Sequence, residues 1–143
     1  ISLCSLSRTI RYGFLNRQAE EELVAEAIDQ IGIKTSSQAA RIKQLSGGNQ
    51  QKCIISRWLL TKPKVLLLDD PTRGIDVGAK ADLYTLIDSL CQAGMAVVLT
   101  SSELPELLGL ADRFIVMNEG RVTGEFSHDE ATEQNLMAAA TLG

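Results

Sequence analysis

Several residue patterns that mark common kinds of site are missing from this sequence of 143 residues. It has one histidine, His128, and its three cysteines, Cys4, Cys53 and Cys91, are widely spaced without a C-x-x-C pair. A zinc site is therefore not expected, and neither is a Ser-His or Cys-His catalytic pair. The cysteines are expected to be free thiols, as in a reducing cytoplasm.

Long apolar runs and an excess of basic residues are also absent. No run approaches the roughly 20 apolar residues of a membrane-spanning helix, and no secretory signal pattern is seen. The formal net charge of −4 argues against a dedicated nucleic-acid surface. The length and the 45% hydrophobic content fit one globular domain of modest size.

The first part of the chain is expected to contain helices only. Residues 1–16 show no clear period, and Tyr12 and Phe14 are expected to pack against a neighbouring helix. From Arg17 onwards apolar residues recur at helical spacing until Gly32 ends the pattern. These residues are Leu23, Val24, Ala27, Ile28 and Ile31.

A second helix is expected to begin at Ser46-Gly47-Gly48 and to run to about Leu60, after a polar loop in which Ser36 or Ser37 caps a short helical turn. Trp58 is interpreted as a core residue of this helix. Its predicted buried face consists of Ile54, Ile55, Trp58 and Leu59.

Strands and helices alternate in the rest of the chain. The apolar runs Val65–Leu68 and Ala96–Thr100 are typical of strands that are covered on both faces. The alternation predicts an α/β fold with a parallel sheet. The other expected elements are helices over Val77–Ala93, from Ser101 or Ser102 to Leu110 and over Asp129–Ala140, and strands over Phe114–Met117 and Arg121–Phe126.

Two segments carry the residues for phosphate and magnesium chemistry. Asp69 and Asp70 follow a predicted strand, where a carboxylate suits Mg²⁺, although an acid there can also simply cap the next helix. In L-S-G-G-N-Q-Q-K, which starts at Leu45, two glycines precede a helix whose N–H groups and dipole favour an anion. A plain helix start is the alternative interpretation of that segment.

Together with V-L-L-L-D-D-P-T-R-G-I-D, the L-S-G-G segment closely resembles the signature motif, Walker B motif and D-loop of an ABC transporter ATP-binding cassette. The form P-T-R-G-I-D-V-G-A-K and the segment S-S-E-L-P-E-L-L-G-L-A-D-R resemble the monosaccharide-import branch (ribose, galactose or xylose), and its C-terminal cassette in particular. The resemblance implies a partial P-loop NTPase: a helical signature subdomain over residues 1–62, followed by an α/β ATPase lobe over residues 63–143.

The resemblance also implies roles for the signature residues. Ser46, Gly47 and Gly48 would contact the γ-phosphate of ATP that is bound to an opposing cassette. Asn49 and Gln50 continue the same motif.

The second segment would contribute to a different ATP site. Asp69 would act on Mg²⁺, mostly through water, and Asp76 of the D-loop would lie across the dimer interface. Asp70 occupies the position of the catalytic Glu of the family, and Ser102 the switch position that often carries His. The shorter carboxylate of Asp70 can cost roughly 100-fold in rate, and Ser102 has no titrating imidazole. Hydrolysis at this site is therefore expected to be slow.

No G-x-x-x-x-G-K-[ST] motif occurs in the 143 residues, and residue 1 is Ile. The family places that Walker A motif upstream of the signature, so it is expected before Ile1. These residues alone are expected not to hydrolyse ATP, whereas the parent protein is expected to be an ATPase coupled to transport.

The resemblance implies ATP and Mg²⁺ as cofactors, and a second cassette and membrane permease subunits as partners. A periplasmic sugar-binding protein would act indirectly, nucleic acid is not expected, and the protein would lie at the cytoplasmic face of the inner membrane. The alternative is a non-catalytic half-cassette that acts only by pairing. A soluble ABC ATPase of DNA repair or translation fits the acidic balance and the P-T-R-G-I-D-V-G-A-K form less well.

Overall fold

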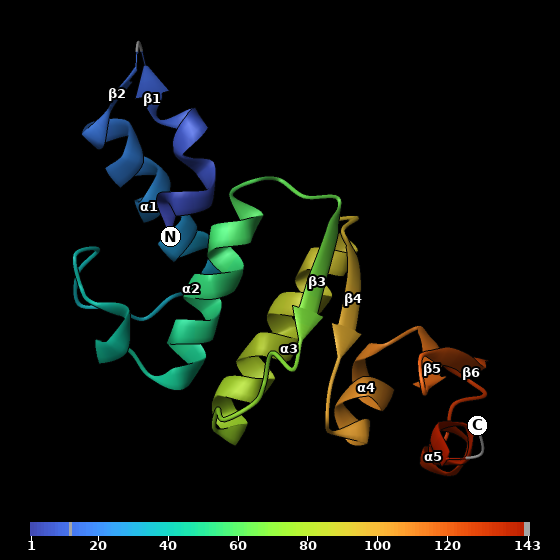
Figure 1. Cartoon of the computed structure of the whole chain (residues 1–143). Coiled ribbons are helices and arrows are strands. Elements are labelled where there is room, and N and C mark those ends of the chain that lie inside the picture. The colour runs from blue at the N-terminus through green and yellow to red at the C-terminus, as the bar shows by residue number, and fades with distance from the viewer. Residues whose placement is uncertain (12, 142–143) are drawn as a thin grey trace. The chain divides into compact units, whose positions relative to one another are not determined.

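A computed structural model of the chain describes residues 1–11 and 13–141 (Figure 1). The chain forms two compact units, one of Ile1–Leu66 with Thr72–Val97 and the other of Leu67–Pro71 with Val98–Gly143. The division into residues 1–62 and 63–143 stays a prediction. None of the described helices is long and apolar enough to cross a lipid bilayer.

The N-terminal part of the first unit differs from the expectation of helices only. A 3₁₀ helix, Ser2–Arg8, is followed by an antiparallel hairpin of β1 (Ile10–Arg11) and β2 (Phe14–Leu15). Strands of two residues are too short to produce a visible alternation in the sequence. Phe14 is 80% exposed, so its predicted packing is wrong, and Tyr12 lies outside the described residues.

The helix predicted before Gly32 is confirmed as α1 (Arg17–Ile31). The Asn16 side chain accepts the Ala19 N–H at its start, and Gly32 ends it with a φ of +64°, which glycine adopts without strain.

In the loop that follows, the N-cap position of the short 3₁₀ helix Ile42–Gln44 is Arg41, so Ser36 and Ser37 do not cap that helix. The Ser37 hydroxyl accepts the Ala39 N–H in a tight turn instead.

The second predicted helix is α2 (Gly47–Leu59), but its buried face is not the predicted one. Ile55 is 1% exposed, whereas Ile54 is 40% and Trp58 51% exposed, so the core assignment of Trp58 is wrong. Contacts of α2 with α1 and with α3 (Val77–Gln92) cover the face that carries Lys52, Ile55 and Ser56. Cys53 packs with Ile31 and Ile33, and burial raises the pKa of its thiol.

The parallel sheet is confirmed as the pairing of β3 (Val65–Asp69) with β4 (Ala96–Thr100), whose arrows run the same way in Figure 1. The Ala96 N–H donates to the Lys64 carbonyl near one end, and the Asp70 N–H donates to the Thr100 carbonyl at the other, each at 3.0 Å.

The prediction that both faces of these strands are covered is wrong for the described chain. Leu66 and Leu68 are buried, while Val65 and Leu67 are 50% and 74% exposed and Val98 is 54% exposed. Exposure alternates because successive side chains of a strand point to opposite faces, and only one face of β3 is covered.

The second unit contains α4 (Leu104–Leu110), β5 (Arg113–Asn118), β6 (Arg121–Ser127) and α5 (Glu133–Thr141). Among the described strands β5 pairs with β6 in an antiparallel hairpin, so its expected place in the parallel sheet is wrong. The helix α4 has Glu103 as its N-cap, not Ser101 or Ser102.

The last helix begins at Glu133 and not at Asp129. The preceding residues form a turn in which the backbone N–H and the hydroxyl of Ser127 both donate to the Glu130 carboxylate. These hydrogen bonds lower the pKa of Glu130.

Neighbouring isoleucines of α2 provide a matched test of this packing. Ile55→Ala is expected to lower the free energy of unfolding by about 2–5 kcal/mol, because it leaves a cavity in the core. Ile54→Ala, on the exposed side of the same helix, should cost less than about 1 kcal/mol. Urea denaturation of both variants checks the prediction, and equal losses would contradict the observed orientation of α2.

Candidate functional site

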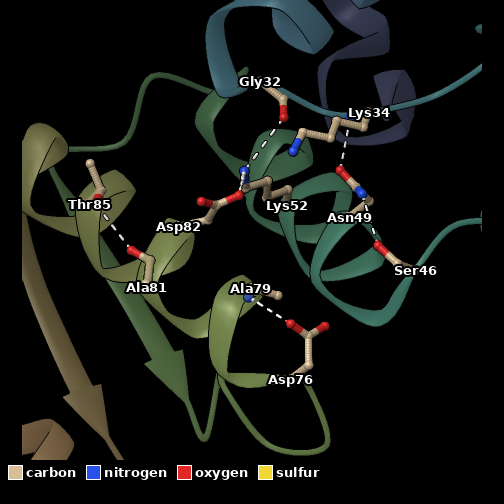
Figure 2. A network of polar contacts seen from close by, with 10 residues as sticks. All are labelled: Gly32, Lys34, Ser46, Asn49, Lys52, Asp76, Ala79, Ala81, Asp82 and Thr85. Atoms are coloured by element: carbon tan, nitrogen blue, oxygen red, sulfur yellow. Dashed lines mark hydrogen bonds and ion pairs between the residues drawn. The ribbon is translucent and has the colours of Figure 1, made fainter.

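The first group of predicted site residues lies where α2 begins. Ser46 is exposed and has extended backbone dihedrals, and its hydroxyl accepts a hydrogen bond from the Asn49 side-chain amide at 2.9 Å (Figure 2). The Gln50 amide donates to the Leu45 carbonyl at 2.8 Å. The side chains of Asn49 and Gln50 therefore hold the backbone and the hydroxyl that precede the helix.

Asp76 occupies the corresponding position at the start of α3. Its Oδ1 accepts the Ala79 N–H at 2.9 Å, as an N-cap does, and the residue is exposed. The first turns of α2 and α3 thus each present an exposed polar side chain beside the N-terminal N–H groups of the helix.

The glycines of the L-S-G-G segment allow these two first turns to come close together. A Cβ atom added to Gly48 would lie 2.5 Å from the Ala79 Cβ, and one added to Gly47 would lie 3.2 Å from the Ile75 Cγ2. The sequence suggested that both glycines serve the approach of an anion. The structure shows that Gly48 is buried and is required by helix packing.

A cavity of about 380 Å³ opens beside this contact. Its lining residues come from both helix starts and from the loop after α1: Lys34, Ser46, Gly48, Asn49, Lys52, Asp76, Gly78, Ala79 and Asp82. The structure therefore brings Ser46, Gly48, Asn49 and Asp76 of the predicted site together.

Asp69, Asp70 and Ser102 form a second cluster, which belongs to the second compact unit. Asp69 Oδ1 accepts from the Thr100 hydroxyl at 2.5 Å. Asp70 Oδ1 accepts from the Ser102 N–H at 2.7 Å and from the Ser102 hydroxyl at 3.0 Å. Residues that follow two paired parallel strands meet at the same sheet edge, as the sequence predicts.

The backbone of Asp70 is left-handed, with a φ of +44°. This conformation is uncommon for a residue other than glycine, although Asp tolerates it better than most. The hydrogen bonds from Ser102 and the bond from the Asp70 N–H to the Thr100 carbonyl hold it in place. The Asp70 carboxylate is therefore fixed in direction, with both side-chain bonds on Oδ1.

Comparisons with known proteins show what the chain is similar to. The family described as "ABC transporter" matches residues 5–73. The xylose import ATP-binding protein XylG of Moorella thermoacetica is 53% identical over 143 residues, which are 100% of this chain and 28% of that protein. Over its whole length the chain is thus similar to this import ATP-binding protein, and its residues 5–73 match the ABC transporter family.

Other ABC proteins show the same relationship. The ribose import ATP-binding protein RbsA of Bacillus subtilis is 48% identical over 143 residues, 100% of this chain and 29% of that protein. The arabinose import ATP-binding protein AraG of Pectobacterium atrosepticum is 51% identical over 143 residues, 99% of this chain and 28% of that protein. The chain thus spans under a third of the length of these curated relatives.

Solved ABC structures share the fold. An inward-facing metal-chelate type ABC transporter matches with a TM-score of 0.80 at 19% identity, over 96% of this chain and 54% of its own. The ATP-binding cassette MJ0796, a dimer with ADP and phosphate, matches with a TM-score of 0.70 at 23% identity, over 86% of this chain and 53% of its own. These likenesses establish the cassette fold.

Sequence reasoning missed three polar residues of the cavity beside the starts of α2 and α3. Lys34, Lys52 and Asp82 line it. Lys52 ends the L-S-G-G-N-Q-Q-K segment but was given no role, and Lys34 and Asp82 lie outside both predicted segments. A lysine in an amphipathic helix is ordinarily exposed, so no pattern in the sequence indicated that Lys52 is buried. Thr100 was also missed, although its place before Ser101 and Ser102 at a strand end was a usable signal.

The contact between the helix starts can be tested with two glycine substitutions. Gly48→Ala is expected to destabilise the chain by about 1–3 kcal/mol, because the new methyl group overlaps Ala79. Gly109→Ala in α4 meets no atom within 4 Å, so it should be neutral or stabilising by up to about 1 kcal/mol. Chemical denaturation measures both, and a harmless Gly48→Ala would show that the helices do not touch there.

Proposed function

We propose that this chain is part of the ATP-binding subunit of a sugar-import ABC transporter and supplies the signature motif to an ATP site on a second cassette. The observation that carries the proposal is the shared cavity of the Ser46 and Asp76 helix starts. The identity of 48–53% to xylose and ribose import ATP-binding proteins supports the transport role.

At the signature, Ser46 is the group best placed to contact a phosphate oxygen. Its oxygen already accepts from the Asn49 amide, so its proton is available for donation. The N–H groups of Gly47 and Gly48 and the dipole of α2 add to the attraction for an anion. Asp76 would lie at the interface between the two cassettes, next to the same nucleotide.

The second cluster would serve the ATP site of its own cassette. The Asp69 carboxylate is exposed, and its Oδ1 accepts from the Thr100 hydroxyl. This fits Mg²⁺, which takes one or two carboxylates together with waters and phosphates. Bound Mg²⁺ would neutralise phosphate charge there. Asp70 would orient a water through Oδ2, and Ser102 would hold the Asp70 carboxylate in position.

The partners follow from the same proposal. A second cassette completes each ATP site, and membrane permease subunits hold the pair at the cytoplasmic face of the membrane. A sugar-binding protein outside would deliver the sugar to the permease.

The transport role is tested in the complete subunit assembled with its permease. Ser46→Ala is expected to lower ATP hydrolysis and sugar uptake together by about 100-fold. This is the typical loss when one hydrogen-bond donor to the charge of the transition state is removed. Ser89→Ala is the control, because the Ser89 hydroxyl donates to the Leu86 carbonyl of its own helix. Normal uptake with Ser46→Ala would rule out the signature role.

A second substitution tests the turnover of this cassette's own site. Asp70→Glu is expected to raise turnover there by up to about 100-fold, because the longer side chain brings the carboxylate to the water. Asp70→Asn, which has the same size and no charge, should give no rise. Steady-state ATPase assays of the complete subunit measure both. An unchanged rate, with substantial turnover left after the partner site alone is blocked, would contradict the proposal.

A further inference from the structure

Lys52 is a buried cation whose role the signature motif does not explain. The residue is 9% exposed in the middle of α2. Its Nζ donates to Asp82 Oδ2 at 3.2 Å and lies 3.5 Å from the Gly32 carbonyl oxygen (Figure 2). A buried ammonium group needs such partners, since an unpaired one is strongly disfavoured.

The ion pair lies one helical turn beyond the contact between the helix starts. Lys52 follows Gly48 by four residues, and Asp82 follows Ala79 by three. The interface of α2 and α3 is therefore held at two points, by close packing at its start and by charge one turn later. Two such points prevent one helix from sliding along or rolling about the other.

A third element is held by the same residues. The loop after α1 offers its Gly32 carbonyl to Lys52, while its Lys34 N–H donates to Asn49 Oδ1 at 2.8 Å. Asn49 in turn donates to the Ser46 hydroxyl. As Figure 2 shows, Lys52 and the Ser46 hydroxyl are thus linked through one short loop.

We propose that Lys52 is a positioning residue for the ATP site that this chain completes. By pairing with Asp82 and the Gly32 carbonyl, it fixes the Ser46 hydroxyl relative to Asp76. The signature segment and the D-loop therefore keep a constant position relative to one another. This inference rests on the proposed function. It adds a residue that acts on the nucleotide only through its effect on Ser46 and Asp76.

The burial pattern separates positioning from simple stabilisation. Lys52→Met removes the buried charge together with its contacts, so it leaves no unpaired ammonium group, and the 54% exposure of the Asp82 side chain lets water screen the pair. The contacts of Lys52 still fix the direction of its side chain, because the ammonium group has two oxygen acceptors from two different elements. Loss of the pair should therefore move the helix starts more than it unfolds the chain.

The experiment uses the complete transporter and four changes: Lys52→Met, Lys52→Arg, Asp82→Asn and the exchange Lys52→Asp with Asp82→Lys. Lys52→Met and Asp82→Asn are expected to lower kcat for ATP hydrolysis by about 10- to 100-fold, the range for misplaced groups. KM for ATP should change less than about twofold, since the nucleotide is held by the other cassette. Lys52→Arg should keep most of the activity, and the exchange should recover part of it.

Two controls distinguish positioning from a structural role. Ile87→Val removes one methyl group from the core of α3, where Ile87 is 4% exposed, and should lower the melting temperature with kcat unchanged. In a Ser46→Ala background, Lys52→Met should lower kcat little further, because it acts through Ser46. If the effects of Ser46→Ala and Lys52→Met on kcat multiply, the inference is overturned. It is also overturned if Lys52→Arg loses as much kcat as Lys52→Met.

The two proposals fail in different ways. If Ser46→Ala leaves ATP hydrolysis intact, the proposed function is wrong and the inference falls with it. If Ser46→Ala lowers hydrolysis while Lys52→Met behaves as the unmodified protein, the inference alone is wrong.

Discussion

The contact between Gly48 and Ala79 is the constraint on which the signature region depends. Because Gly48 has no side chain, the first turn of α3 can lie directly against the first turn of α2. The places of the Ser46 hydroxyl, the Asp76 carboxylate and the cavity beside them follow from that approach. This site is therefore made by helix packing, and its geometry is as well defined as the interface of the two helices.

The second cluster obtains its geometry in another way. Asp69 and Asp70 follow one strand of a parallel pair, and Thr100 and Ser102 belong to the next strand and the loop after it, so the pairing of the strands brings them together. Hydrogen bonds then fix the carboxylates, and they also hold Asp70 in its left-handed backbone conformation. A sheet edge and a helix interface thus supply two different kinds of fixed polar site.

Local signals explain what could be predicted from the sequence. Gly32 ends α1 where expected, and the letters around Leu45 and Asp69 located the candidate site residues, because caps, turns and strand ends depend on adjacent residues. The exposure of Trp58 and the burial of Lys52 depend on which neighbours each face of α2 meets. Asp82 lies thirty residues further along the chain, so no local pattern could show that pairing.

Cys53, which follows Lys52 directly, makes the opening of the signature helix observable. Its thiol is 8% exposed and its pKa is raised by burial, so at neutral pH it stays protonated and shielded from reagents. Separation of α2 from Ile31 and Ile33 should therefore speed up the alkylation of Cys53. The labelling rate of this one thiol would report the local opening free energy of the helix that carries the signature, at any stage of the ATP cycle.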